Sequence, residues 1–321
     1  MTTDALGRRI HYLRISITDR CNFRCSYCMP RTGVKWLEPG KILTYEEIIR
    51  FVEAAVLLGI DKVRVTGGEP LVREGVVSLI SELARIPGIR DLAMTTNGSL
   101  LSKFASDLKK AGLKRLNISL DTLNAAKFAK LCYQNQFEQV IEGIRIGDSV
   151  GLQPIKINIV VMKGFNEDEI AKFARLTIEK PYQIRFIECM PFKFARDQSL
   201  VSTDEMKQIL ADEGFSELCP QPSGDGPAQI YSLPGAQGTI GFISPMTRHF
   251  CSSCNRIRLT ADGMLKPCLL ANSEYDIRSL LRSGASKQEL ADYLRNVIFE
   301  KPAFYLETQD KFTRGMSKIG G

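Results

Sequence analysis

Residues 12–28 read Tyr12-Leu-Arg-Ile-Ser-Ile-Thr-Asp-Arg-Cys21-Asn-Phe-Arg-Cys25-Ser-Tyr-Cys28. The first seven alternate between apolar and polar side chains, a pattern that predicts a β-strand. The loop that follows carries three cysteines in CxxxCxxC spacing. Three thiolates can hold three irons of a four-iron cluster and leave the fourth iron open to another ligand. The alternative is a zinc site, but zinc is usually held by CxxC pairs and four ligands.

The first 190 residues alternate strand-like and helix-like segments. The predicted strands are 12–18, 62–66, 91–96, 115–120, 155–161 and 183–188. Six strand–helix units predict parallel strands joined by crossover helices, because parallel neighbours cannot be joined by tight turns. Six units are too few for a closed eightfold barrel, so we expect an α/β fold built as a partial (β/α)6 TIM-like barrel. An open doubly wound sheet is the alternative, and either would place a site at the carboxyl ends of the strands.

Helix boundaries follow from capping signals. Thr44 with Glu47 forms a capping box for a helix that ends near Gly59, and Ser286 with Glu289 opens the last helix. We expect Ser102 and Asn166 to cap two further helices. A hairpin is expected from 230–233 and 239–243.

The strand–helix rhythm ends near residue 190. We therefore expect one domain at 5–190, which carries the first cysteine group, and a second at 191–321. The final segment, 315–321, contains three glycines and is expected to be mobile.

A second cysteine group lies in this C-terminal part. Cys251 and Cys254 form a CxxC pair, and Cys268 follows after thirteen residues. An iron–sulfur cluster with one open iron, a zinc ribbon short of one ligand and half of a redox pair all fit this spacing. Cys132, Cys189 and Cys219 are isolated in the sequence and are expected to be ordinary buried or surface residues.

Amino-acid composition excludes several classes of protein and of metal site. Nine cysteines in a chain without a secretory signal argue against structural disulfides, and only two histidines argue against a His-based zinc site or a Ser/His/Asp hydrolase. No apolar run reaches the ~18 residues of a membrane helix, so a cytoplasmic protein is expected. The net charge of +7 suits either a soluble protein with a basic bias or an anionic substrate.

Two motifs together carry a resemblance to a known superfamily. The CxxxCxxC loop with Tyr27 before its last cysteine, and Gly67-Gly68-Glu69-Pro70 after the second strand, resemble the joint signature of radical S-adenosylmethionine enzymes. The segment 241–269, with Cys251-Ser-Ser-Cys254-Asn-Arg-Ile-Arg258 inside it, resembles the GTP 3′,8-cyclase family of molybdenum cofactor biosynthesis. The terminal Gly320-Gly321 also fits that family.

This resemblance implies a fold, two cofactors and a reaction. It implies a radical S-adenosylmethionine barrel whose open side is closed by a C-terminal iron–sulfur domain, with two 4Fe-4S clusters and S-adenosylmethionine. The implied enzyme is a lyase that converts GTP to (8S)-3′,8-cyclo-7,8-dihydroguanosine 5′-triphosphate. A 5′-deoxyadenosyl radical would take hydrogen from ribose C3′, and the carbon radical would then attack guanine C8.

The resemblance also assigns roles to individual residues. Cluster ligands would be Cys21, Cys25, Cys28, Cys251, Cys254 and Cys268. Tyr27, Gly68, Ser119 and Met190 would contact S-adenosylmethionine. Arg14, Arg64, Thr95, Lys156, Arg256, Ile257 and Arg258 would contact GTP, with Lys62, Asn97 and Arg185 as further contacts. The residues agree with this, since a cation inside an apolar strand is costly without an anionic partner.

Partners and alternatives complete the expectations. The family implies a flavodoxin-type or other reductant, functional coupling to cyclic pyranopterin monophosphate synthase and a possible homodimer, with neither nucleic acid nor membrane as a partner. One alternative is a radical enzyme that matures peptides, although such enzymes usually carry more than three C-terminal cysteines. Another is a cluster-based sensor or nucleic-acid-binding protein, which would need a basic helix or patch that the sequence lacks.

Overall fold

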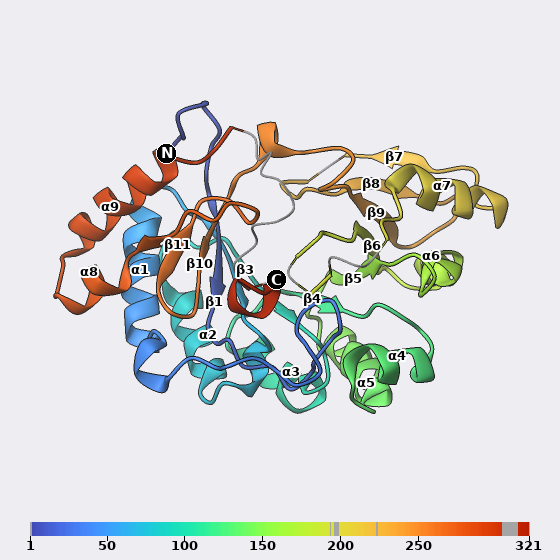
Figure 1. The fold of residues 1–321 in the computed structure, drawn as a ribbon, viewed down its shortest axis with the longest axis horizontal. Helices are drawn as coiled ribbons and strands as arrows, with labels where there is room; N and C mark the ends of the chain where they lie inside the picture. Colours follow the sequence, from blue (N-terminus) through green and yellow to red (C-terminus); the bar gives the residue numbers. More distant parts are fainter. Residues whose placement is uncertain (1, 193, 196–198, 223, 304–313, 321) are drawn as a thin grey trace.

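The computed structural model describes residues 2–192, 194–195, 199–222, 224–303 and 314–320. Its strands form one sheet of twelve, in the order β12-β11-β10-β1-β2-β3-β4-β5-β6-β9-β8-β7. Figure 1 shows the sheet curving around a central space, with helices on its outer side.

The middle of the sheet is the predicted six-stranded partial barrel. Strands β1 to β6 follow one another in sequence and are parallel throughout. They comprise Tyr12–Ser16, Lys62–Thr66, Asp91–Thr96, Arg115–Ser119, Ile155–Val161 and Gln183–Glu188. The connecting helices are α1 (Tyr45–Leu57), α2 (Val76–Arg85), α3 (Leu101–Lys110), α4 (Ala125–Cys132), α5 (Phe137–Ser149) and α6 (Ile170–Glu179). Both the (β/α)6 prediction and the parallel arrangement are confirmed.

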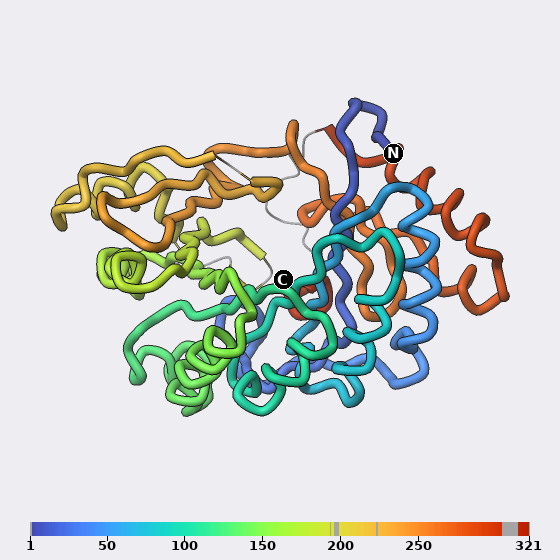
Figure 2. Tube along the Cα trace, turned by 180° about the vertical axis from the view of Figure 1, so that it is seen from behind, coloured from blue at the N-terminus to red at the C-terminus, as the bar shows by residue number. Residues whose placement is uncertain are grey.

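The chain after β6 extends this sheet at both edges. At one edge, β9 (Thr239–Ile243) runs parallel to β6, and β8 (Gln229–Ser232) and β7 (Cys219–Gln221) follow antiparallel. At the other edge, β10 (Arg256–Leu259) runs parallel to β1, followed by β11 (Met264–Lys266) and β12 (Tyr275–Asp276). Both views show the orange and red late segments lying beside the blue start of the chain (Figures 1 and 2).

The remaining helices are α7 (Thr203–Asp212), α8 (Arg278–Arg282) and α9 (Lys287–Phe299). Helix α9 packs against α1, and Lys287 Nζ lies 2.7 Å from Glu53 Oε2 across that contact. No helix in the described part of the chain has the length and apolarity needed to cross a membrane.

Apolar side chains of the helices and the outward strand faces form the core. Helix α1 buries Phe51 and Val52, and neighbouring strands bury Leu13, Val63 and Val65. Alternate residues on the same strands therefore point into the barrel. There they include Arg14 and Arg64, so the inner face is polar while the outer face is apolar.

The capping boxes at Thr44 and Ser286 are present as predicted. The two other predicted side-chain caps do not form. Ser102 lies inside the first turn of α3, whose cap position is Leu100. Asn166 stands at the N-cap position of the 3-10 turn Glu167–Glu169 that leads into α6, but its side chain makes no capping bond. Its Nδ2 donates instead to the carbonyls of Asp121 and Val160, at 2.7 and 2.9 Å, and so ties the segment after β4 to β5.

The C-terminal segment also differs from expectation. Residues 316–318 form a 3-10 turn, Ser317 and Ile319 are buried, and the Gly320 carbonyl accepts a 2.9 Å bond from Arg258 Nη1. This segment is thus packed inside the barrel rather than mobile, because Arg258 and the ends of β1 and β2, at Ser16 and Thr66, lie against it. Gly321 lies outside the described residues.

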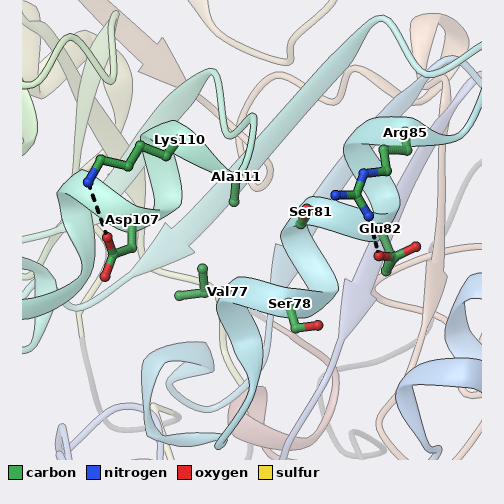
Figure 3. Close-up of a pocket in the computed structure, with 8 residues that line it drawn as sticks. All are labelled: Val77, Ser78, Ser81, Glu82, Arg85, Asp107, Lys110 and Ala111. Carbon is green, nitrogen blue, oxygen red and sulfur yellow. Dashed lines mark hydrogen bonds and ion pairs between the residues drawn. The ribbon is translucent and has the colours of Figure 1, made fainter.

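A shallow hollow on the outer surface lies between α2 and α3 (Figure 3). It is lined by Val77, Ser78, Ser81, Glu82, Arg85, Asp107, Lys110 and Ala111. Its charged side chains pair within their own helices, Arg85 with Glu82 at 2.6 Å and Lys110 with Asp107 at 3.8 Å. The hollow therefore brings together no convergent polar groups of the kind a binding site uses.

Candidate active site

The curved sheet encloses a cavity of about 720 Å³. All six cysteines of the two groups line it, together with inward residues of strands β1 to β6. In this cavity the two cysteine groups can therefore act on the same molecule.

The first cysteine group lies where β1 ends. The Cys25 carbonyl accepts bonds from the Cys28 and Met29 amides, at 2.8 and 3.1 Å, which folds the loop into a tight turn. The loop rests on the segment after β2, since the Gly68 amide donates to Thr18 O and the Glu69 amide to Arg20 O, both at 2.8 Å. A Cβ at Gly68 would overlap the Arg20 carbonyl. The glycine is required here because two backbones meet.

Glu69 joins the ends of two strands. Its buried carboxylate accepts bonds from Thr96 Oγ1 at 2.7 Å, the Asn97 amide at 2.6 Å and the Leu71 amide at 3.1 Å. Burial raises the pKa of Glu69 to about 7, against the lowering effect of these donors. Glu69 thus fixes the carboxyl end of β2 to that of β3 beside the cysteine loop.

Tyr27 and Asp121 form a second fixed pair near this loop. The Tyr27 hydroxyl donates to Asp121 Oδ2 at 2.9 Å, and the Val160 amide donates to Oδ1 at 2.8 Å. Burial raises the pKa of Asp121 to about 6. Tyr27 and Asp121 line the same cavity as Ser119 and Met190. An aromatic ring and a carboxylate are therefore held in place at the first cysteine group.

The second cysteine group lies at the opposite end of the strands. Arg256, the first residue of β10, pairs with Tyr12 at the start of β1, and Cys254 comes two residues before it. Cys21 instead follows the end of β1. The length of β1, roughly 13 Å from its first to its last residue, therefore separates the levels of the two groups.

Cations hold the second cysteine group. Arg8 Nη1 donates to the Cys251 carbonyl at 2.7 Å, and Lys301 Nζ donates to the carbonyls of Arg256, at 2.9 Å, and Pro267. Although burial opposes it, Arg256 and Lys301 lower the pKa of Cys254 to about 6. A thiolate is thus favoured there, and thiolate is the form that binds metal. Within the described residues, no three such side chains converge tightly enough for a single ion.

Between the two groups the cavity wall is cationic. Arg14 of β1 is level with Arg64 of β2 and Arg258 of β10, and Lys156 and Arg185 lie on β5 and β6. Burial, and then the charges of Arg185, Arg115 and Arg64, lower the pKa of Lys156 to about 6. Burial likewise lowers the pKa of Arg185 to about 9.

The cations of this wall are of two kinds. Arg115 and Lys62 share Asp91, at 2.7 and 3.5 Å. Within the described part of the chain, Arg64, Lys156 and Arg185 have no carboxylate at ion-pair distance, and the Nε atoms of Arg64 and Arg185 and the Thr95 hydroxyl are buried without a hydrogen-bond partner. Buried donors without a partner are costly, so they favour the binding of an anionic ligand. These residues suit a polyphosphate.

The thiols of each cysteine triad suit an iron–sulfur cluster.

The cavity brings together every candidate residue named from the sequence except Ile257. The side chain of Ile257 is buried in the core, 1% exposed, because it alternates with Arg256 and Arg258 along β10. Lys62, Asn97 and Arg185 also line the cavity. Sequence reasoning missed Tyr12, Asp91, Arg115, Asp121 and Asp225, which line it too. Strand parity was the available signal for the first three, and the position directly after a predicted strand was the signal for Asp121; Asp225 comes from a loop and had none.

Cys132 was expected to be isolated from the other cysteines, but it lies beside one of them. Cys132 Sγ lies 3.5 Å from Cys25 Sγ, although 107 residues separate them. Cys189 is buried and Cys219 is exposed, as ordinary cysteines would be.

Comparison with known proteins identifies both parts of the chain. Residues 15–177 match the Radical SAM superfamily model, and residues 182–306 match the model named Molybdenum Cofactor Synthesis C. The GTP 3′,8-cyclase of Thermodesulfovibrio yellowstonii is 52% identical over 322 residues, which cover 99% of each chain. The GTP 3′,8-cyclase of Moorella thermoacetica is 47% identical over 321 residues, again 99% of each.

Solved structures share the fold at low sequence identity. Streptococcus suis SuiB bound to S-adenosylmethionine aligns with a TM-score of 0.63 and 16% identity, over 89% of this chain and 68% of that one. Methylornithine synthase aligns with a TM-score of 0.52 and 18% identity, over 90% and 87%. At this identity the likeness concerns the fold alone. Family models and full-length relatives together place the chain in the GTP 3′,8-cyclase family of the radical S-adenosylmethionine superfamily.

Proposed function

We propose that this chain is a lyase that converts GTP to (8S)-3′,8-cyclo-7,8-dihydroguanosine 5′-triphosphate, the first step of molybdenum cofactor biosynthesis. The observation that carries the proposal is one shared cavity with a thiol triad at each end. Between the triads lie Arg64, Lys156 and Arg185, which have no carboxylate partner among the described residues. Near-50% identity to GTP 3′,8-cyclases over the whole chain supports the same reading.

Each end of the cavity has its own task in this proposal. Cys21, Cys25 and Cys28 hold one 4Fe-4S cluster, with Tyr27, Gly68, Ser119 and Met190 around S-adenosylmethionine. When bound, these two groups supply a 5′-deoxyadenosyl radical. The enclosing barrel keeps water and other hydrogen donors away from the radical's path.

The other end and the middle hold the nucleotide. Cys251, Cys254 and Cys268 would hold the second 4Fe-4S cluster, which would bind the guanine. Contacts to GTP come from Arg14, Arg64, Thr95, Lys156, Arg256 and Arg258, and from the backbone at Ile257. Charge-assisted bonds to phosphate contribute about 1.5–3 kcal/mol each, so several are needed to fix a triphosphate.

The proposal extends to partners. A flavodoxin-type or similar one-electron reductant feeds the first cluster, and cyclic pyranopterin monophosphate synthase takes up the product. A cytoplasmic location and a homodimer are part of the same proposal.

The test is an anaerobic turnover with reconstituted protein, dithionite, S-adenosylmethionine and GTP. We expect 5′-deoxyadenosine and the cyclised nucleotide to form together, and only when GTP is present. Iron analysis should give about eight irons per chain, two four-iron clusters' worth. If 5′-deoxyadenosine formed with a peptide and not with GTP, the proposal of a cyclase would be wrong and a peptide-maturing enzyme would take its place.

A further inference from the structure

Cys132 is the last residue of α4, and its side chain is 3% exposed. Its sulfur lies 3.5 Å from the sulfur of Cys25. Cys25 lines the cavity, whereas Cys132 lies behind it and is not part of the lining. A thiol that faces the cavity is thus backed by a second thiol that does not.

The backbone fixes this proximity. The Arg24 amide donates to the Cys132 carbonyl at 3.1 Å, and the Ser26 amide donates to the Leu131 carbonyl at 3.0 Å. The residues on both sides of Cys25 are therefore bonded to the end of α4. The Phe23 ring adds an edge-on contact with Phe128 of the same helix, with centroids 5.6 Å apart.

A disulfide between the two sulfurs needs only a small movement. The bond is about 2.05 Å long, so the sulfurs must approach by roughly 1.5 Å, which rotation of the two side chains can supply once the backbones are this close. We propose that Cys25 and Cys132 form a reversible disulfide when the first cluster is absent, with a small peroxide as the oxidant.

The chemistry takes two steps. Hydrogen peroxide from the cavity oxidises the Cys25 thiol to a sulfenic acid, and one water leaves as the O–O bond breaks. The Cys132 sulfur then attacks the sulfenic sulfur, the S–S bond forms, and the sulfenic oxygen leaves as a second water with the Cys132 proton. Two thiols lose two electrons in all, and one peroxide gains them.

The disulfide and the cluster exclude each other, because one sulfur cannot serve both. This exclusion rests on the proposed role of Cys25 as an iron ligand. The formation of the disulfide does not depend on that role. Its effect is protective, since a sulfenic acid without a resolving thiol can be oxidised further to an irreversible sulfinic acid. A dithiol reductant returns the disulfide to two thiols.

The experiment uses the full-length protein, either with its clusters loaded or after their removal by a chelator under anaerobic conditions. Each form is treated with a small excess of hydrogen peroxide, quenched in acid, alkylated and digested with trypsin. The sequence gives a peptide 25–31, which holds Cys25 and Cys28, and a peptide 131–145, which holds Cys132. We expect the two peptides to be linked in the cluster-free protein, with fragmentation placing the link at Cys25, and dithiothreitol to release them.

Iron rebinding provides the second readout. After peroxide and then dithiothreitol, the wild-type protein should regain its full iron content. Cys132→Ser should lose most of the iron of one cluster, because without the resolving thiol the sulfenic acid at Cys25 is oxidised further to an irreversible sulfinic acid. Cys189→Ser removes another buried cysteine and is expected to behave like the wild type.

The outcomes separate the parts of the proposal. A free Cys132 in oxidised cluster-free protein, or Cys25 linked to Cys21 or Cys28 instead, overturns the disulfide. Full iron recovery by Cys132→Ser overturns its protective effect. If that variant does not fold, the wild-type peptide map decides alone. Equal linkage in cluster-loaded protein overturns the exclusion and the ligand role of Cys25, while the disulfide stands.

Discussion

Arg64 and Lys156 are ionisable side chains in a place where charge is costly. Both line the cavity inside the barrel, and neither has a carboxylate within ion-pair distance among the described residues. Arg115 differs, because Asp91 neutralises it. An unpaired buried charge lowers the stability of the empty protein and raises its affinity for a polyphosphate.

Replacing Arg64 by alanine should weaken GTP binding and leave the iron content unchanged. One lost charge-assisted bond, about 1.5–3 kcal/mol, corresponds to a roughly ten- to hundredfold higher dissociation constant. Equilibrium binding of GTP to cluster-loaded protein measures it. Arg85→Ala, on the outer surface of α2, is the matched control, and equal affinity in both variants would remove Arg64 from the site.

Lys156 should make the stability of the empty protein depend on pH. Its folded pKa is about 6, below the ~10.4 of an exposed lysine, so the unfolded chain binds more protons between these values. Stability should therefore rise as the pH increases from 6 towards 10. Lys156→Met should flatten this rise, as measured by denaturant unfolding of cluster-free reduced protein at pH 7 and pH 9. An unchanged slope would contradict the lowered pKa of Lys156 in the folded protein.

At the scale of elements, the contact between the cysteine loop and the segment after β2 organises the first site. It was predictable in part: the sequence order placed both at carboxyl strand ends, where parallel strands bring side chains together. The reason for Gly68 was not predictable. Its missing Cβ makes room for the Arg20 carbonyl, and that carbonyl comes from a loop 48 residues earlier in the chain.

Gly68→Ala should therefore damage one cluster. The added Cβ would push the cysteine loop away from β2, and we expect the iron content to fall to about half. Gly40→Ala is the control, since nothing lies within 4 Å of a Cβ there. Iron analysis and electron paramagnetic resonance of the reconstituted proteins measure the result. Full iron content in Gly68→Ala would show that the cysteine loop can shift to accommodate the added Cβ and still hold its cluster.

Local signals predicted local structure. Alternating side chains located the six barrel strands, and Thr44 and Ser286 located two helix starts, because these depend on neighbouring residues. Asn166 failed as a cap because its partners, the carbonyls of Asp121 and Val160, are brought to it by tertiary folding. The approach of Cys132 to Cys25 was hidden for the same reason. The roles of the site residues stay predictions.

At the scale of the whole molecule, the C-terminal part belongs to the same sheet as the barrel. β9 extends the β6 edge and β10 the β1 edge. The pairing of β10 with β1 joins residues more than 240 positions apart, and no short-range pattern indicates it. The expected boundary near residue 190 stays a prediction, but the hydrogen bonding of the sheet crosses it twice.

A chain that ends at residue 190 should not form a stable soluble barrel. Without β9 and β10, both edges of the six-stranded sheet expose unpaired backbone groups, which favour aggregation. Expression of residues 1–190 beside the full chain, followed by gel filtration and circular dichroism, tests this. A soluble, monomeric and folded fragment would show that the barrel is independent.

The basic side chains between the two cysteine groups have a practical consequence. Because Arg64 and Arg185 have no carboxylate partner among the described residues, and Lys156 can take up a proton when an anion binds, the empty barrel works as a small anion exchanger. Phosphate or citrate in a purification buffer will occupy it, raise the melting temperature and compete with nucleotide. Affinities for GTP are therefore best measured in buffers whose anions are monovalent and weakly bound, with ionic strength held constant.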